Sequence, residues 1–329
     1  MSGGENILIS VVIPSYNRAD TVGETIDSIA TQEGIGKEFD VEIVIGDDCS
    51  TDNAREVLQQ YKEKYPTLIR LLLHEKNMGL GANWATCVME SEGKYICNCD
   101  NDDYWHNKQK LRLQLAYMEE HPQANVLLTD YRRHHRETGV IVEEKTYVDK
   151  TVTTQDAIMH GKYTICNASI MYRGDFLKSH VNLQDYVKYQ FTLQDWNTWF
   201  ILSADTTFDI LPVSTATFGV ETESITRPRT YEKLAQRMRK ERECVEYLGT
   251  LFPKYQLEEG EWDWLTATRL LDLAFHKNDY AAAHKYAKEL KQGIFLPHGL
   301  SKKAKLAQCR LTFSLWVLAK KIVRLCRKR

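Results

Sequence analysis

Apolar positions in the first part of the chain alternate between short β-branched runs and longer stretches with helical spacing. Residues 7–13 form an apolar, β-branched run that is typical of a strand buried in a parallel sheet, and Pro14 is expected to end it. Further strands are predicted at residues 41–45, 68–73, 95–97 and 126–128, and helices at residues 21–31, around 57–58, 82–89 and 111–118. This alternation predicts an open, mainly parallel α/β sheet flanked by helices.

The pattern changes to helices from about residue 226 onward. Helices are predicted at residues 231–248, 262–275 and 280–290, and the last two resemble one hairpin of a helical repeat. A single copy does not make a solenoid, which needs about three repeats. We therefore expect an α/β domain over residues 1–225 and a helical region over residues 226–329.

Composition is that of an ordinary soluble protein, with 43% hydrophobic and 27% charged residues among 329. No apolar run approaches the roughly 18–20 residues of a membrane span, and residues 1–6 lack a signal-peptide pattern. The eight cysteines are scattered without a C-x-x-C pair, which favours free thiols in a reducing compartment. A cytoplasmic chain is expected.

The formal net charge of −2 conceals an acidic front part and a basic back part. Residues 1–225 carry 20 Lys and Arg against 34 Asp and Glu, whereas residues 301–329 carry ten basic residues and no acid. Apolar residues, Trp316 among them, lie between these basic ones. Such a segment fits the surface of an anionic membrane, which we favour, or a helix packed on the domain body. No nucleic-acid partner is expected, because the front part lacks a basic, aromatic pattern.

An acidic cluster follows the predicted strand at residues 95–97. Asp100, Asp102 and Asp103 place three carboxylates within four positions, and carboxylates so close repel one another unless a cation compensates them. Oxygen ligands at this spacing suit Mg²⁺ or Mn²⁺, which often share them with nucleotide phosphates. The alternative is a solvated acidic turn, since Asp and Asn are common turn residues.

Two other predicted strands also end in polar residues. Pro14-Ser15-Tyr16 ends the first strand, and Asp47-Asp48 ends the second. In open parallel sheets ligands bind at the carboxyl ends of the strands. Their convergence with the acidic cluster favours a ligand site over a chance acidic turn.

Four motifs in the right order resemble the family 2 glycosyltransferases over about residues 7–225. They are Val11–Arg18 (VVIPSYNR), Val44–Asp52 (VIGDDCSTD), Asn77–Gly79 (NMG) and Glu92–Ile96 (EGKYI) leading into Asp100–Asp103 (DNDD). The resemblance implies a GT-A fold and the transfer of a sugar from a nucleotide sugar with inversion, usually with Mn²⁺ or Mg²⁺. A hexosyl- or hexosaminyltransferase is therefore expected.

The resemblance also implies a role for individual residues. Pro14, Ser15 and Tyr16 would line the base pocket, and Asp48 would accept a hydrogen bond from the base. Asp102 would be the metal ligand, with Asp100 facing ribose or metal.

Neighbouring positions have expected structural roles. Asp47 would be a structural carboxylate, and Asp103 would cap a helix beginning near Asn107. Cys49 stands where the family commonly has Gly, which narrows the turn conformations available.

Asp195 is the expected general base, about 90 residues after the metal motif. An inverting transfer needs such a group to take the acceptor proton, and Gln194 replaces an acidic partner found in many relatives, which leaves Asp195 as the single candidate. The alternative is a simple N-cap of the helix that follows. Trp105, Trp196 and Trp199 are either sugar-stacking rings or core residues, and His134, His135 and His160 are expected to bind no metal.

The sequence thus predicts a metal-dependent, inverting glycosyltransferase that uses a UDP-sugar. Its acceptor would be a glycan or lipid-linked molecule at the cytoplasmic face of a membrane. The alternatives are a non-catalytic nucleotide-sugar-binding or assembly protein on the same scaffold, and a sugar-1-phosphate nucleotidyltransferase. The last expects a Gly-rich loop and a Lys after the first strand, which Pro14–Arg18 does not supply.

Overall fold

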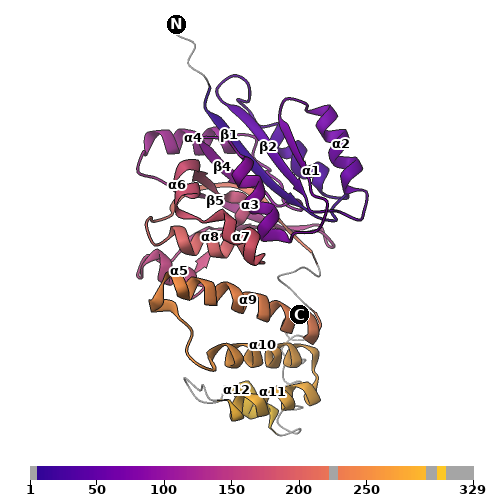
Figure 1. Ribbon diagram of the computed structural model, residues 1–329, viewed down its shortest axis with the longest axis vertical. Coiled ribbons are helices and arrows are strands. Elements are labelled where there is room, and N and C mark those ends of the chain that lie inside the picture. Colours follow the sequence, from indigo (N-terminus) through magenta and orange to yellow (C-terminus); the bar gives the residue numbers. More distant parts are fainter. Residues whose placement is uncertain (1–5, 222–228, 294–301, 309–329) are drawn as a thin grey trace, which may run out of the picture. The chain divides into compact units, whose positions relative to one another are not determined.

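The computed structural model describes residues 6–221, 229–293 and 302–308 (Figure 1). The chain divides into two compact units, Met1–Thr222 and Glu223–Arg329. The position that the sequence suggests for a domain boundary, between residues 225 and 226, lies outside the described residues. Each unit is considered separately below.

The first unit is built on an eight-stranded sheet in the order β10-β5-β9-β4-β1-β2-β3, with β6 paired to β5. Its strands are β1 Leu8–Ser15, β2 Asp40–Asp47, β3 Ile69–Leu73, β4 Tyr95–Asn98, β5 Val126–His135, β6 Val140–Glu144, β9 Met171–Arg173 and β10 Asp209–Val220. A separate two-stranded ribbon pairs β7 Tyr147–Val148 with β8 Tyr163–Thr164. Pairs among β1 to β4 and between β5 and β10 are parallel, whereas β9 and β6 run antiparallel to their neighbours.

Helices cover both faces of this sheet (Figure 1). They are α1 Val22–Ala30, α2 Ala54–Lys64, α3 Leu80–Glu90, α4 Lys110–Glu120, α5 Thr154–Met159, α6 Gly174–His180, α7 Leu183–Tyr189 and α8 Gln194–Leu202. Apolar residues of α1, α2 and α4 pack with the odd-numbered β1 residues Ile9, Val11 and Ile13 in one core. Helices α3 and α7 pack together, and α3 lies against β1 and β2. The predicted mainly parallel, helix-flanked sheet is confirmed.

Pro14 does not end β1, contrary to the expectation from the sequence. The strand continues to Ser15, and Pro14 pairs with Gly46 of β2. Val12 O accepts from Cys99 N on the β4 side, so by the alternation of the strand the nitrogen of Pro14 points to that side too. The β1–β4 ladder has ended by then, at Val12 and Asn98, so the missing N–H interrupts no pairing.

The register of β1, β2 and β4 brings their carboxyl ends to one edge of the sheet. Ser15 lies opposite Asp47 of β2, and Val12 lies opposite Asn98 of β4. Hydrogen bonds extend this alignment beyond the strands, because Asn101 Nδ2 donates to Ser15 Oγ at 3.1 Å. The convergence of polar strand ends expected from the sequence is therefore present.

The second unit contains the helices α9 Tyr231–Leu251, α10 Glu261–Lys277, α11 Tyr280–Gln292 and α12 Lys302–Ala307, with a short 3₁₀ turn at Pro253–Tyr255. Helices α10 and α11 form the hairpin expected from the sequence. Asn278 takes a left-handed conformation, with φ of 58°, at the end of α10, and Asp279 caps α11 by accepting from Ala282 N at 3.0 Å. Residues of α10, α11 and α12 share one core.

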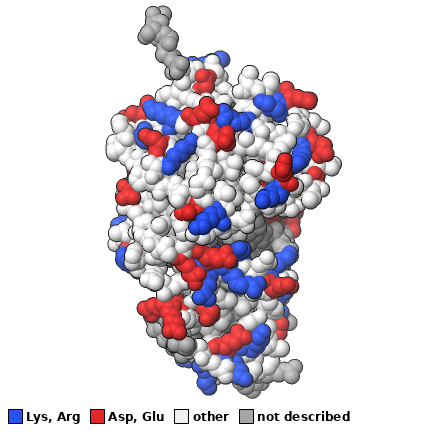
Figure 2. Space-filling view, viewed as in Figure 1, with Lys and Arg blue, Asp and Glu red and all other residues white. Residues whose placement is uncertain are grey.

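The charge of the helical region is unevenly distributed along the sequence. Residues 229–293 carry 12 Lys and Arg against 11 Asp and Glu, so the basic excess lies elsewhere, chiefly in residues 301–329. On the face shown in Figure 2, side chains of both signs are interspersed. Apart from residues 302–308, the predicted basic segment lies outside the described residues. None of the helices in the described ranges combines the length and hydropathy of a membrane-spanning segment.

Candidate functional site

Tyr16 follows β1 at the edge where the strands converge, and its side chain is accessible. It is 44% exposed, which is unusual for an aromatic residue beside a core. Its neighbours Pro14 and Ser15 belong to the strand itself, and Ser15 is buried. An exposed ring on a fixed strand end can stack on a planar ligand.

The two carboxylates that end β2 have different surroundings. Asp47 accepts from Ser50 N at 3.2 Å and from Arg55 Nε at 2.5 Å, so it holds the following turn in the structural role expected. Asp48 accepts from two backbone groups, Met78 N at 2.6 Å and Gly79 N at 2.9 Å. Asp48 is only 2% exposed, so its observed role is to fix this loop, although each of its oxygens keeps a second lone pair.

The backbone conformation of Cys49 shows why the resemblance led us to expect glycine at this position. Its backbone has φ of 60°, in the left-handed region that residues with a Cβ rarely adopt. The turn therefore keeps the conformation that glycine favours, although the residue is a cysteine.

The three acidic residues after β4 point to different partners. Asp100 accepts from the Asn167 side-chain amide, whose Nδ2 lies 3.4 Å and 3.3 Å from the two Asp100 carboxylate oxygens. Asp102 Oδ2 lies 3.5 Å from Arg18 Nη2. Asp103 is buried and accepts from Gly219 N of β10 at 2.8 Å through Oδ1.

The expectation that Asp103 caps the next helix is wrong. Helix α4 begins at Lys110 after Gln109, whose side chain makes no cap bond, and Gln32 Oε1 accepts from Leu111 N of its first turn at 3.3 Å. The Asp103 carboxylate accepts from Gly219 N instead, because β10 passes directly over the acidic loop Asp100–Asp103. A Cβ on Gly219 would lie 2.2 Å from Asp102 O, so only glycine allows this approach.

Asp195 lies near the acidic loop although about 90 residues separate them in sequence. Helix α8 begins at Gln194 after Leu193, so Asp195 occupies the first turn and is not the N-cap. Its Oδ1 accepts from Trp196 N at 2.7 Å. Burial raises the pKa of the Asp195 carboxyl above the usual range of aspartate.

The pKa of Asp100 reflects this proximity. Burial is the main cause that raises it to about 7, and the charges of Asp102 and Asp195 raise it further in that order. A cation would relieve the repulsion that Asp100 experiences from these two carboxylates. The structure thus places Asp102 and Asp195 close enough for their charges to act on Asp100.

Several residues of this site carried no role in the sequence interpretation. Arg18 pairs with Asp102, Arg136 Nη2 donates to Asp102 O at 2.7 Å, and Asn167 contacts Asp100. Arg18 carried a usable signal, since a cation two residues after Tyr16 is suited to a phosphate. Arg136 and Asn167 come from later segments that only the tertiary structure brings here.

Two of the three tryptophans, Trp105 and Trp199, are core residues. Trp105 is 3% exposed and donates to Ala168 O, and Trp199 is 3% exposed and donates to Tyr172 Oη. Trp196 is half-buried and stacks on Phe200. Only Trp196 retains surface that a ligand could touch.

The donor set fits a magnesium or manganese ion that shares its ligands with a substrate. Within the described ranges, no group of three or more His, Cys, Asp or Glu side chains could hold a metal alone. Mg²⁺ is commonly held by one or two carboxylates together with substrate phosphates. Asp100 and Asp102 can supply such carboxylates, because both are half-buried and so reachable from solvent.

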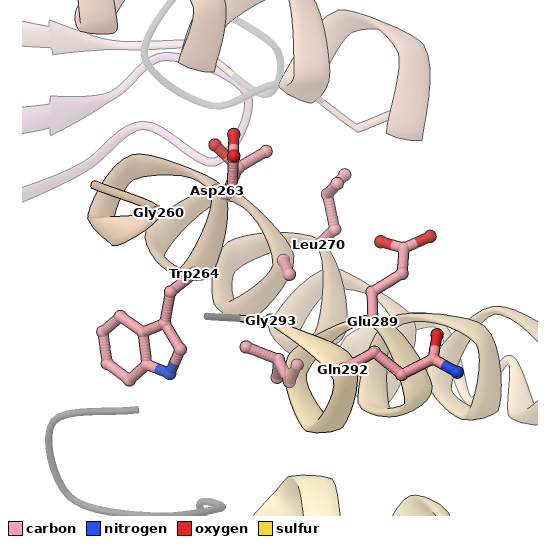
Figure 3. A pocket seen from close by; sticks show the side chains of 10 residues that line it. Gly260, Asp263, Trp264, Leu270, Glu289, Gln292 and Gly293 are labelled. Carbon is pink, nitrogen blue, oxygen red and sulfur yellow. The ribbon is translucent and has the colours of Figure 1, made fainter. Parts of the chain in front are cut away.

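A separate cavity of about 460 Å³ lies in the second unit. Figure 3 shows it lined by Asp263 and Trp264 from α10 and by Glu289 and Gln292 from α11. It contains none of the residues discussed above, so it does not belong to this site.

Solved structures with the same fold cover most of the chain. S. aureus TarS 1–349 in complex with UDP is 21% identical, with a TM-score of 0.52 over 86% of this chain and 83% of that one. The mannosyltransferase PcManGT from Pyrobaculum calidifontis, in complex with GDP-Man and Mn²⁺, is 14% identical, with a TM-score of 0.52 over 96% and 84%. These likenesses confirm the predicted GT-A fold followed by a helical region.

Sequence comparison identifies the family. The putative teichuronic acid biosynthesis glycosyltransferase TuaG of Bacillus subtilis is 33% identical over 151 residues, which are 46% of this chain and 57% of that protein. Mycobacterial relatives that are 36% identical are matched over only 33% of their own length. The sequence model of glycosyl transferase family 2 matches residues 10–180, more than half of the chain. The protein therefore belongs to glycosyl transferase family 2, as its motifs had indicated.

Proposed function

We propose that this protein is an inverting, metal-dependent glycosyltransferase that transfers a hexosyl or hexosaminyl group from a UDP-sugar to a hydroxyl group of a glycan or lipid-linked acceptor. The observation that carries the proposal is that the segment around the exposed Tyr16 lies against the acidic loop Asp100–Asp103. Asn101 Nδ2 donates to Ser15 Oγ, and Arg18 Nη2 lies 3.5 Å from Asp102 Oδ2. The charge of Asp195 also acts on Asp100. One edge of the sheet then offers a base-stacking ring, metal-binding carboxylates and a candidate proton acceptor.

The donor would bind across the carboxyl ends of β1, β2 and β4. Tyr16 would stack on uracil above Pro14 and Ser15, and Asp48 would accept from the base with its remaining lone pairs. The bound UDP in S. aureus TarS and the bound GDP-Man in PcManGT are consistent with a nucleotide donor on this fold.

Asp102, with Asp100 beside it, would hold Mn²⁺ or Mg²⁺. When bound, the ion neutralises charge that develops on the leaving diphosphate. Arg18 adds a second positive charge on the same side, since its guanidinium already lies against Asp102. The Mn²⁺ in the PcManGT complex supports a metal on this fold.

Asp195 would act as the general base. The acceptor oxygen forms a bond to the anomeric carbon on the face opposite the diphosphate, its proton passes to an Asp195 carboxylate oxygen, and the carbon–oxygen bond to the diphosphate breaks. The raised pKa of Asp195 makes it a stronger proton acceptor than an ordinary aspartate. This single displacement inverts the anomeric centre.

The acceptor class is argued from the relatives and from the charge pattern. TuaG is named for teichuronic acid biosynthesis, which supports an extended surface glycan. The basic segment at residues 301–329 supports a location on an anionic membrane surface at the cytoplasmic face, where a lipid-linked glycan would be presented.

Release of UDP from UDP-sugars, with and without Mn²⁺ and a glycan acceptor, tests the proposal directly. We expect turnover to require the metal, and Asp102→Ala and Asp195→Ala each to lower kcat by about 10²-fold or more. Nucleotide binding should survive in Asp195→Ala, because its carboxylate faces the acceptor.

The outcomes also separate the alternatives. If the donor binds but no turnover is found, the protein is a nucleotide-sugar-binding or assembly protein. If the unsubstituted protein turns over and neither substitution lowers kcat, the roles given to Asp102 and Asp195 are wrong. Release of pyrophosphate from UTP and a sugar 1-phosphate would identify a nucleotidyltransferase. An anomeric configuration retained in the product would contradict the single-displacement mechanism.

A further inference from the structure

A line of hydrogen bonds connects helix α3 to the acidic loop. Trp84 Nε1 donates to Asn98 Oδ1 at 3.1 Å, and Asn98 Nδ2 donates to Asn167 Oδ1 at 2.8 Å. Asn167 Nδ2 then reaches both carboxylate oxygens of Asp100, at 3.4 Å and 3.3 Å. These three residues, here called the amide relay, come from α3, β4 and the 3₁₀ turn Asn167–Ser169.

The direction of the amide relay follows from its first member. An indole N–H can only donate, so Asn98 must present its oxygen to Trp84 and its NH₂ group to Asn167. Asn167 must then accept through its oxygen, which turns its own NH₂ group toward Asp100. Asparagine oxygen and nitrogen are otherwise interchangeable in shape, and only the partners decide their orientation.

Burial makes this direction hard to reverse. Trp84, Asn98 and Asn167 are 1%, 2% and 7% exposed, so water does not compete for their hydrogen bonds. A flipped Asn167 would place its oxygen against the Asp100 carboxylate, where two acceptors repel each other.

The turn that carries Asn167 is also held in place. Trp105 Nε1 donates to Ala168 O at 2.9 Å, and Gln114 Nε2 donates to Ser169 O at 2.9 Å. The backbone on the C-terminal side of Asn167 is thus fixed by donors from outside the turn. The Asn167 side chain therefore has a defined position from which to contact Asp100.

We propose that Asn167 is a positioning residue that holds the Asp100 carboxylate in place for metal binding, and that Trp84 sets the required amide orientation through Asn98. The inference rests on the proposed function in giving Asp100 a role toward the metal. In this role Asn167 acts by donating to the Asp100 carboxylate, whose oxygens keep further lone pairs for a metal. No charge is introduced, so the metal site keeps its negative potential.

Titration of Mn²⁺ into the full-length protein with UDP, followed by the electron paramagnetic resonance signal of the free ion, measures this role without catalysis. Asn167→Ala should weaken Mn²⁺ binding by about 10–100-fold, as is typical when a partner that orients a metal ligand is lost. Trp84→Phe keeps an aromatic ring but removes the donor, and should weaken it by about 2–10-fold. UDP binding without metal should stay within about 2-fold of the unsubstituted protein.

The two substitutions together distinguish a relay from general loss of packing. Because Trp84 acts through Asn167, the double variant should bind Mn²⁺ no more weakly than Asn167→Ala alone. Asn125→Ala is the matched control, since Asn125 donates to Thr206 Oγ1 at 3.4 Å away from the acidic loop, and it should leave Mn²⁺ binding unchanged.

Unchanged Mn²⁺ binding in Asn167→Ala, or additive losses in the double variant, would overturn the proposal. Should Asn167→Ala not fold, Trp84→Phe alone decides, and unchanged Mn²⁺ binding in that variant overturns the relay. Asp102→Asn separates this result from the proposed function. If it weakens Mn²⁺ binding while the relay variants do not, only the relay is wrong. If Asp102→Asn and Asp100→Asn both leave Mn²⁺ binding unchanged, the metal site itself is wrong and the relay falls with it.

Discussion

The guanidinium group of Arg18 lies 3.5 Å from the carboxylate of Asp102, at the edge where β1 and β4 end. Both side chains keep access to solvent, at 34% and 21% exposure. A partly exposed pair of this kind contributes only about 0–1 kcal/mol to stability. Its position beside the proposed diphosphate site suggests that its main contribution is to ligand binding.

Arg18→Gln should therefore weaken donor binding and leave the fold intact. Loss of a charge-assisted hydrogen bond to phosphate is expected to raise the Kd for UDP by about 10–100-fold. Calorimetric titration with UDP and Mn²⁺ measures this change. Arg112→Gln is the matched control, because Arg112 pairs with Glu38 on the surface at similar exposure and should not alter UDP binding. An unchanged Kd in Arg18→Gln would remove Arg18 from the donor site.

Gly81 lies at the start of α3, directly after the loop whose backbone donates to Asp48, and it packs against Phe191 in the segment that leads into α8. A Cβ at this position would lie 2.2 Å from Phe191 O, four residues before Asp195. Gly81→Ala should push this segment away, at a cost of about 1–3 kcal/mol in stability. Because small displacements of a catalytic group are costly, we expect kcat to fall by about 10²-fold.

Steady-state kinetics on this variant show whether the contact matters for Asp195. The KM for the donor should change less than kcat if the displacement is confined to the base. Gly293→Ala in the second unit is the control, because its Cβ would meet Glu289 O at an ordinary 3.5 Å. Equal kinetic effects in both variants would exclude a specific role for the Gly81–Phe191 contact.

Asp102 and Asp103 are adjacent, yet we expect opposite results from the same substitution. Asp103 is buried, its Oδ1 already accepts from Gly219 N, and burial raises its pKa well above the usual range, so it is expected to bind no metal. Asp103→Asn keeps the acceptor for Gly219 N and should leave Mn²⁺ binding within about 2-fold, whereas Asp102→Asn should abolish it. Mn²⁺ titration of the two variants is the measurement, and similar losses in both would contradict the separate roles.

The pH dependence of turnover should report Asp195. Its pKa lies above the usual value of about 3.9 because of burial, and only the deprotonated form accepts a proton. kcat should therefore fall as the pH falls through this raised pKa. Measurements at saturating donor and Mn²⁺ should show the acidic limb in the unsubstituted protein and lose it in Asp195→Asn. A residual rate in Asp195→Asn with the same limb would assign the titration to another group.

Asp100 should make the metal-free protein less stable as the pH rises. Its folded pKa of about 7 exceeds the unfolded value of about 3.9, so the folded state holds more protons between these values. Its favourable contribution is fully present below about pH 4 and is lost as the pH rises through about 7. Asp100→Asn should thus raise the Tm above that of the unsubstituted protein near neutral pH, by about 2–4 °C per kcal/mol gained.

Differential scanning fluorimetry without metal tests this sign. The difference in Tm should shrink as the pH approaches about 4, where the unsubstituted carboxyl is protonated in both states. Adding Mn²⁺ with UDP should stabilise the unsubstituted protein more than the variant, because only the former keeps the ligand. A variant that is less stable at neutral pH would contradict the raised pKa.

Much of the fold was predictable because local patterns and global packing agree. The β-branched runs at β1 and β2 and the helical spacing of α1 and α10 each specify an element that the structure contains. Few elements were predicted for residues 140–220, where the structure has β6 to β10 and α5 to α8. Pro14 and the length of β5 were also predicted incorrectly. Pro14 remains in β1 because the pairing of β1 with β4 ends before it, at Val12 and Asn98. Strand β5 extends to His135 because it pairs there with β6 and β10.

The candidate site was predictable only in part, for a physical reason. The predicted donor-site residues end or directly follow strands whose ends must align in a parallel sheet, so their sequence positions implied their proximity. They are Pro14, Ser15, Tyr16, Asp48, Asp100 and Asp102. Asp103 was assigned to the wrong partner, because its partner Gly219 lies on β10, more than a hundred residues later.

The sequence by itself determined the strands and helices up to the start of β5, the helices α9 to α11, the family and the strand ends that carry polar residues. These depend on local periodicity and on short motifs. Only the tertiary structure decided that Asn167 and Arg136 contact the acidic loop and that the charge of Asp195 acts on it. It also decided that Trp84 orients the Asn167 amide through Asn98. Such contacts depend on how distant segments pack, and the pattern of one segment holds no record of its distant neighbours.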